Sequence, residues 1–161
     1  MNNYYQTIQS PIGALTIEAS DLGLRSIHYN KEINGEFPNG HTEHAVKELR
    51  CYFNQNLLSF TVPLDWTGYS DFFIQVWQYL KTIPYGKTVT YMSIAKYLNN
   101  PGAVRAVGMA NGKNPIPIIV PCHRVIGSNG DLTGFALGID IKEKLLALEN
   151  PQQFGIQGNL F

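Results

Sequence analysis

The chain has 161 residues, of which 44% are hydrophobic and 15% are charged, and Lys plus Arg equals Asp plus Glu at 12 each. This composition can fill a hydrophobic core, which excludes an intrinsically disordered chain. The neutral charge balance does not suggest nucleic-acid binding, so any contact with DNA would require a local basic or polar face. There is no apolar stretch of membrane-spanning length and no leader-like N-terminus, so we expect a soluble, cytoplasmic protein.

Residues 1–67 have the pattern of a small α/β domain. Apolar and polar residues alternate between residues 4 and 29, which indicates a short antiparallel sheet, and residues 30–41 have the composition of a loop. The helix that follows has an apolar face made of Ala45, Leu49 and Phe53. Alternation returns at residues 60–64 and predicts another strand. It ends near Gly68, where we place the domain boundary.

Residues 68–161 predict a mainly α-helical domain. Its first helix has an apolar stripe made of Phe73, Val76, Trp77 and Leu80. Two short helices follow, over residues 91–98 and 103–111, with Asn100 as the N-cap and Pro101 as the first helical residue after a tight turn. Two short helices joined in this way form a helix-turn-helix, an arrangement that is typical of DNA-binding domains.

Cys51 and Cys122 are far apart and in unlike surroundings, which argues against a disulfide framework, and Cys51 lies on a polar helix face. Cys122 follows a predicted buried strand at residues 116–120. A buried cysteine can be a small hydrophobic residue, but His123 and Arg124 could support a thiolate here. Side chains of consecutive strand residues point to opposite faces. The segment is therefore a turn or helix start, or a water carries the proton from Cys122 to His123.

The last predicted helix begins near Asp140, which is spaced from Glu143 as in a capping box, and Pro151 limits it. Glu149 falls on the apolar stripe of this helix. One interpretation is a frayed last turn with the carboxylate in solvent. The other pairs Glu149 with a histidine, in a cysteine, histidine and glutamate relay that activates a nucleophile.

The helix over residues 103–111 is built largely from small residues, which allow close approach to another surface. That surface is either the rest of the protein or a ligand, and the sequence leaves both open. Arg105 would project from this helix and would suit a phosphate or insertion between bases.

The segment Pro121-Cys122-His123-Arg124-Val125, preceded by Asn114-Pro115, closely resembles the active-site signature of the methylated-DNA–protein-cysteine methyltransferases. The resemblance covers nearly the whole chain in family order and spacing. The other matching segments are Ser10-Pro11-Ile12-Gly13, Ile83-Pro84-Tyr85-Gly86, Thr90-Tyr91, Arg105-Ala106-Val107-Gly108, and Lys142-Glu143 through Glu149.

The resemblance implies that Cys122 accepts an alkyl group from O6-alkylguanine, and possibly from O4-alkylthymine, in a stoichiometric and irreversible DNA-repair reaction. His123 would take the thiol proton through a water and Glu149 would orient His123. Tyr91 would assist the departing guanine, and Asn114 would order the active-site turn. No cofactor is implied.

The resemblance also implies that a monomer enters the minor groove of duplex DNA through its helix-turn-helix and flips the damaged base, with Arg105 filling the space that the base leaves. The implied DNA-binding residues are Thr90, Ala103, Arg105, Ala106, Gly108 and Asn111. The implied substrate pocket consists of Pro117, Val125, Phe135, Ala136 and Leu137.

Two features differ from the family pattern. Leu137 stands where glycine is common, and we hypothesise that it narrows the pocket, so that bulky adducts react poorly while methyl reacts well. Some relatives bind zinc in the N-terminal domain through cysteines and histidines. This chain has no cysteine before Cys51, and His41 and His44 have no evident third ligand, so we expect no metal.

Three competing functions remain. A DNA-damage sensor without transfer activity would replace the cysteine, whereas Cys122 is present. A cysteine hydrolase or redox protein would turn over a thioester or peptide and would not bind DNA. A transcription regulator would need a second module or a dimer interface, and neither is evident in the sequence.

Overall fold

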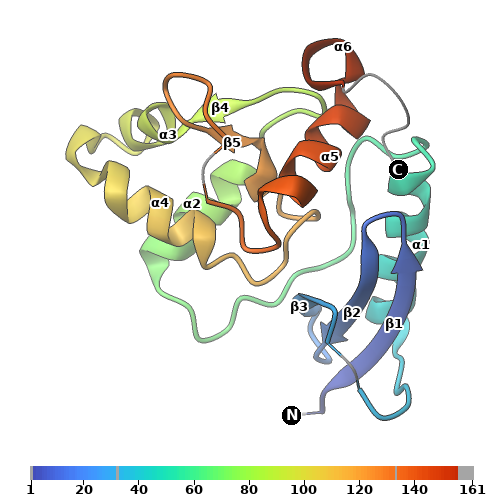
Figure 1. Ribbon diagram of the computed structural model, residues 1–161. Helices are drawn as coiled ribbons and strands as arrows, with labels where there is room; N and C mark the ends of the chain where they lie inside the picture. The colour runs from blue at the N-terminus through green and yellow to red at the C-terminus, as the bar shows by residue number, and fades with distance from the viewer. Residues whose placement is uncertain (1, 32, 133, 156–161) are drawn as a thin grey trace. The chain divides into compact units, whose positions relative to one another are not determined.

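The structure is a computed structural model that describes residues 2–31, 33–132 and 134–155, so residues 156–161 of the predicted second domain lie outside the described residues. The chain divides into two compact units, and the division falls between Thr67 and Gly68. The first unit contains the strands and the helix within residues 4–53, and the second contains the remaining helices and strands (Figure 1).

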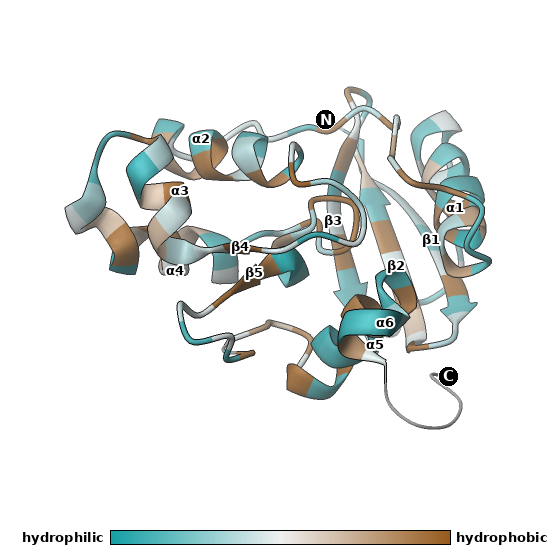
Figure 2. Ribbon diagram, turned by 90° about the horizontal axis from the view of Figure 1, so that it is seen from above, coloured by the Kyte–Doolittle hydropathy of each residue, from teal (hydrophilic) through white to brown (hydrophobic). Residues whose placement is uncertain are grey.

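The first unit is an antiparallel sheet with one helix, as the sequence predicts. Its strands, in spatial order, are β1 (Tyr4–Ser10), β2 (Gly13–Ala19) and β3 (Leu24–Tyr29). Hydrophobic and hydrophilic residues alternate along β2 (Figure 2), where Leu15 and Ile17 are fully buried. Helix α1 (Gly40–Phe53) packs against the sheet and is capped by Asn39, whose side chain accepts from the Thr42 backbone N–H.

The strand predicted at residues 60–64 is wrong, because this segment forms only an isolated bridge between Leu24 and Leu64. The reason is a competing acceptor. The buried carboxylate of Glu48 accepts the backbone N–H groups of Thr61 and Val62 at 2.9 Å, and these groups would otherwise donate to a neighbouring strand.

The second unit is mainly helical, again as predicted. Its α-helices are α2 (Asp71–Leu80), α3 (Tyr91–Tyr97), α4 (Val104–Gly112), α5 (Ile139–Glu149) and α6 (Pro151–Phe154). Two 3-10 turns, η1 (Pro101–Ala103) and η2 (Cys122–Arg124), and a parallel pair of short strands, β4 (Val89–Thr90) and β5 (Val125–Ile126), complete it.

Helices α3 and α4 pack together as a helix-turn-helix, and α4 also packs against α2. Trp77 of α2 is fully buried, and its indole N–H donates to the Ala110 carbonyl at 2.8 Å. The inner face of α4 is thereby anchored to the core, which leaves its opposite face outside. None of the helices within the described ranges is long and apolar enough to cross a membrane.

The start of two predicted helices differs in the structure. Pro101 begins the 3-10 turn η1 and not α4 itself. Tighter 3-10 turns of this kind are frequent at the N-terminal ends of α-helices. Helix α5 begins after Gly138, whose φ of 101° suits glycine, so Asp140 lies in the first turn and is not the cap.

The predicted strand at residues 116–120 is also wrong, because the segment forms consecutive turns although it is buried. Prolines at 115, 117 and 121 remove backbone donors that a strand ladder needs. Asn114 supplies the hydrogen bonds instead: its side chain accepts from the Ile116 N–H at 3.0 Å and donates to the Val120 carbonyl at 2.7 Å.

Candidate active site

Cys122 opens the 3-10 turn η2 directly after the Asn114-supported turns, and only 2% of its surface is exposed. Its carbonyl oxygen accepts a hydrogen bond from Nδ2 of Asn111 at 3.3 Å. The turn is one of the geometries that the sequence left open for the Cys122-His123 pair. The nucleophile candidate therefore stands on a short 3-10 turn whose backbone is held by the Asn111 side chain.

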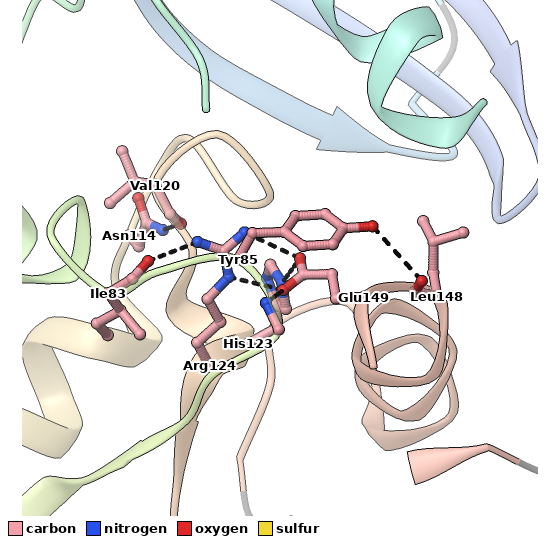
Figure 3. A network of polar contacts seen from close by, with 9 residues as sticks. Ile83, Tyr85, Asn114, Val120, His123, Arg124, Leu148 and Glu149 are labelled. Atoms are coloured by element: carbon pink, nitrogen blue, oxygen red, sulfur yellow. Dashed lines mark hydrogen bonds and ion pairs between the residues drawn. The ribbon is translucent and has the colours of Figure 1, made fainter. Parts of the chain in front are cut away.

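His123, Arg124 and Glu149 form one buried network (Figure 3). Nε2 of His123 lies 2.6 Å from Oε2 of Glu149, and the Arg124 guanidinium donates from Nε at 2.8 Å and from Nη2 at 3.1 Å to the two carboxylate oxygens. Arg124 also donates to the Ile83 carbonyl at 2.7 Å and lies over the Tyr85 ring. The frayed-turn interpretation of Glu149 is therefore wrong, and the histidine pairing is present.

The charges in this network determine which ring nitrogen of His123 carries the proton. Burial opposes ionisation of Glu149, yet the charges and hydrogen bonds of His123 and Arg124 outweigh burial and hold the pKa of Glu149 well below its ordinary value. Burial lowers the pKa of His123 and outweighs the carboxylate beside it, so the ring is neutral at pH 7. An ionised carboxylate can only accept, so the ring proton lies on Nε2.

Nδ1 of His123 is consequently the ring nitrogen with a free lone pair. It is buried and makes no hydrogen bond within the described part of the chain. A neutral imidazole in this tautomer can take a proton at Nδ1, directly or through one water. The arrangement can therefore act as a general base whose orientation is set by Glu149.

Cys122 is a thiol at rest. Burial raises its pKa to about 11, although the Asn114 side chain and the charge of Lys142 act in the opposite direction. Lys142 of α5 is itself fully buried, and its Nζ donates to the Val125 carbonyl at 2.6 Å. Burial lowers the pKa of Lys142 to about 8, so most of this charge is still present at pH 7. A thiolate would thus form only as a proton leaves during reaction.

The outer face of α4 carries Arg105 and Ala106, both exposed, and the half-buried Gly108. A side chain added at Gly108 would meet no atom within 4 Å, so this part of the helix is open and is not tightly packed within its own unit. Ala103 and Thr90 are half-buried, and the Thr90 hydroxyl caps α3 by accepting from the Ser93 N–H at 3.1 Å.

Asn111, which the resemblance implies as a DNA-binding residue, is only 3% exposed. Its side chain points inward to Cys122 and is a support of the nucleophile turn. The position follows from helical geometry, because Asn111 lies four residues after the buried Val107 on the same face of α4.

A hollow of about 520 Å³ adjoins the outer face of α4, and its lining consists of Tyr91, Gly108, Gly112, Gly134, Phe135 and Ala136. Phe135 connects the hollow to the buried network of His123, since its ring meets the His123 ring edge to face at 6.4 Å between centroids. Three residues expected in the pocket lie outside this lining. Pro117 and Val125 are buried beneath the surface and Leu137 is half-buried.

The sequence reasoning did not assign roles to Arg124 as the partner of Glu149 or to Lys142 as a buried cation. It also missed a charge pattern: residues 72–130 contain no Asp or Glu, although the whole chain is neutral. The exposed basic residues within this range are Lys81, Lys87, Lys96, Arg105 and Lys113. A count of charge by segment would have found this basic region.

Within the described ranges, no group of three or more His, Cys, Asp and Glu side chains is arranged to hold a metal ion. The two histidines considered as zinc ligands have other contacts. His41 Nε2 is 3.2 Å from the Asp21 carbonyl, and His44 Nε2 is 3.0 Å from the Thr61 hydroxyl.

Each of the two units matches a known protein-family model. Residues 71–151 match the family model of the 6-O-methylguanine DNA methyltransferase DNA-binding domain, and residues 3–66 match that of its ribonuclease-like domain. The methylated-DNA–protein-cysteine methyltransferase of Methanosarcina acetivorans is 48% identical over 153 residues, which are 91% of this chain and 97% of the relative. That of Mycolicibacterium paratuberculosis is 47% identical over 151 residues, 90% of this chain and 91% of the relative.

Solved structures give the same result. The crystal structure of Mycobacterium tuberculosis O6-methylguanine methyltransferase matches with a TM-score of 0.83 at 45% identity over 94% of each chain. The Mycobacterium tuberculosis OGT in complex with DNA matches with a TM-score of 0.82 at 47% identity, over 91% of this chain and 92% of that one. By its sequence over both units and by its fold, this chain belongs to the methylated-DNA–protein-cysteine methyltransferase family.

Proposed function

We propose that this protein repairs duplex DNA by transferring the alkyl group of O6-alkylguanine to Cys122. The sulfur attacks the alkyl carbon in line with the carbon–oxygen bond, an S–C bond forms, and the C–O bond breaks. The bonding electrons leave with the guanine oxygen. The thiol proton passes to Nδ1 of His123. A proton returns to the ring of the departing guanine, and Tyr91, which lines the hollow, assists the departure of the guanine. The same displacement suits O4-alkylthymine.

The observation that carries this proposal is the buried relay beside Cys122: Nε2 of His123 is 2.6 Å from Glu149, and Nδ1 has no partner within the described residues. A hydrolase would use the same kind of relay, but a thioether product has no leaving group that water can displace under mild conditions. One protein therefore repairs one lesion, because the Cys122 thiol is consumed and is not regenerated for a second turnover.

Base flipping and minor-groove entry complete the proposal. Arg105 is exposed on the open face of α4, and the hollow on this face is large enough for a nucleobase. An extruded guanine in the hollow would leave a gap in the duplex, which Arg105 is placed to fill. Cys122 is 2% exposed, so docking of the base must open a path to the sulfur. We also propose that the protein acts as a monomer and that it acts in the cytoplasm.

Intact-mass spectrometry with peptide mapping tests the function. After incubation with a duplex carrying one O6-methylguanine, we expect a gain of one methyl group per protein, confined to the Cys122 peptide. Cys51 is the internal control, because it is half-buried and lies outside the relay. Lesion-selective binding without a mass gain would instead identify a damage sensor, and neither binding nor mass gain would overturn the proposal.

We further propose that methyl adducts react faster than bulky ones. Phe135 and Ala136 line the hollow, and the half-buried Leu137 follows them directly in the same loop, so a leucine in place of glycine adds bulk next to the lining. Single-turnover rates with O6-methylguanine and O6-benzylguanine in the same duplex provide the test. Comparable rates would refute this restriction while leaving the transfer reaction itself intact.

A further inference from the structure

Met109 is an unexplained feature of the outer face of α4. Its side chain is 61% exposed, although methionine is a large apolar residue that is usually buried. Met109 follows Arg105 by four residues, so the two side chains are neighbours on the same side of the helix. Gly108 and Gly112 lie on the other side of Arg105, where they line the hollow. Arg105 therefore stands between an apolar side chain and the hollow.

The surroundings of Met109 indicate the charge of its partner. Residues 72–130 contain no acidic residue, and the exposed Lys96, Arg105 and Lys113 lie on or next to the helix-turn-helix. A polyanion is the complementary partner of such a surface. An exposed methionine within it gains nothing from phosphates, so its contact must be with the less polar part of that polyanion.

We propose that Met109 is an apolar wedge that enters the minor groove beside Arg105 and partly unstacks the base step next to the flipped nucleotide. Minor-groove proteins use apolar side chains in this way, because the sugar edges and base faces are the apolar surfaces of DNA. Arg105 fills the gap left by the extruded base while Met109 holds the neighbouring step open. The inference rests on the proposed function and adds a second intruding residue to it.

Duplex binding by fluorescence anisotropy over a range of salt concentrations tests the wedge. Met109→Ala removes the apolar side chain and keeps helix propensity, and we expect it to weaken binding on the order of tenfold at every salt concentration. The slope of log K against log salt should stay the same, since no phosphate contact is lost. Met109→Leu should retain most of the affinity. Leu58→Ala, at an apolar residue 67% exposed in the first unit, is the matched control and should bind like the wild type.

A 2-aminopurine placed next to the lesion reports unstacking directly. The wild type should raise its fluorescence on binding, and Met109→Ala should give a smaller rise at saturating protein. Equal affinity and an equal rise for the two proteins would overturn the wedge, as would a shallower salt slope for Met109→Ala. Because the wild type is assayed for methyl transfer with the same duplex, a wild type without transfer would refute the proposed function instead.

Discussion

Nδ2 of Asn111 donates to the carbonyl oxygen of Cys122 at 3.3 Å, which connects the inner face of α4 directly to the residue that holds the nucleophile. The outer face of the same helix carries Arg105 and Met109. In the proposed function, α4 docks on DNA through one face and supports Cys122 through the other, so this helix would fix the distance between duplex and sulfur.

Asn111→Leu should separate these two tasks, because it keeps the volume of the buried side chain and removes the donor. The Cys122 carbonyl then has one hydrogen bond less in a buried site, which costs about 1–3 kcal/mol. We expect the single-turnover rate of methyl transfer to fall about tenfold while duplex affinity is retained. Lys113→Ala changes an exposed residue at the same end of the helix. This variant should retain the transfer rate, lower the duplex affinity and reduce the salt slope of binding. A loss of affinity in Asn111→Leu at an unchanged rate would contradict this division.

Glu149→Gln should disable the relay and destabilise the protein. The neutral amide leaves the buried Arg124 without its charge partner, which should lower the free energy of unfolding in urea by about 3 kcal/mol. A glutamine can also donate to Nε2 and so favour the tautomer with the proton on Nδ1, which removes the base. We expect a transfer rate lower by on the order of hundredfold or more. Glu143→Gln, at an exposed carboxylate on the same helix, should leave both quantities unchanged.

Lys142→Met should reduce the reactivity of Cys122 while the contact between His123 and Glu149 stays in place. The buried ammonium favours the thiolate, so its removal raises the pKa of Cys122 still further. Iodoacetamide alkylation at pH 7.5, in a Cys51→Ser background, should slow several-fold. Lys144→Met, two residues along α5, is the control. An unchanged alkylation rate in Lys142→Met would show that the Lys142 charge does not reach the sulfur.

The sequence predicts the elements whose pattern is local. The antiparallel strands and the helices α1 to α5 follow from alternation, helical stripes and capping signals. The histidine partner of Glu149 is one of two interpretations of a carboxylate on an apolar stripe, and the sequence does not choose between them. The two wrong strand predictions have one cause in common. At residues 60–64 and 116–120 a side chain, Glu48 or Asn114, takes the backbone hydrogen bonds that a strand would use. Such competition depends on contacts that periodicity does not encode.

The site shows the same limit. The resemblance implies roles for Cys122 and its relay residues, yet it does not reveal that Asn111 points inward or that the buried charge of Lys142 acts on Cys122. The direction of Asn111 depends on which face of α4 is anchored, and that is settled by Trp77 and its hydrogen bond to Ala110. Residues far apart in sequence decide it, so a motif cannot.

The pH dependence of Cys122 alkylation gives the last prediction. Because burial raises the pKa of Cys122 to about 11, the thiolate fraction grows about tenfold with each pH unit well below that value. In the absence of DNA, the alkylation rate should follow this slope from pH 6.5 to 7.5. Lys142 loses its charge around its pKa of about 8, which withdraws support from the thiolate, so the slope should become shallower above pH 8.

Lys142→Met distinguishes this break from saturation of the thiolate itself. Without a titrating ammonium, the variant should start from a lower rate and keep the tenfold slope through pH 8.5, as its thiol is still far from its pKa. If the alkylation rate of the variant levels off at the same pH as that of the wild type, the change of slope comes from the titration of Cys122. The thiol would then have a pKa near 8, and burial would not be the dominant influence on the nucleophile.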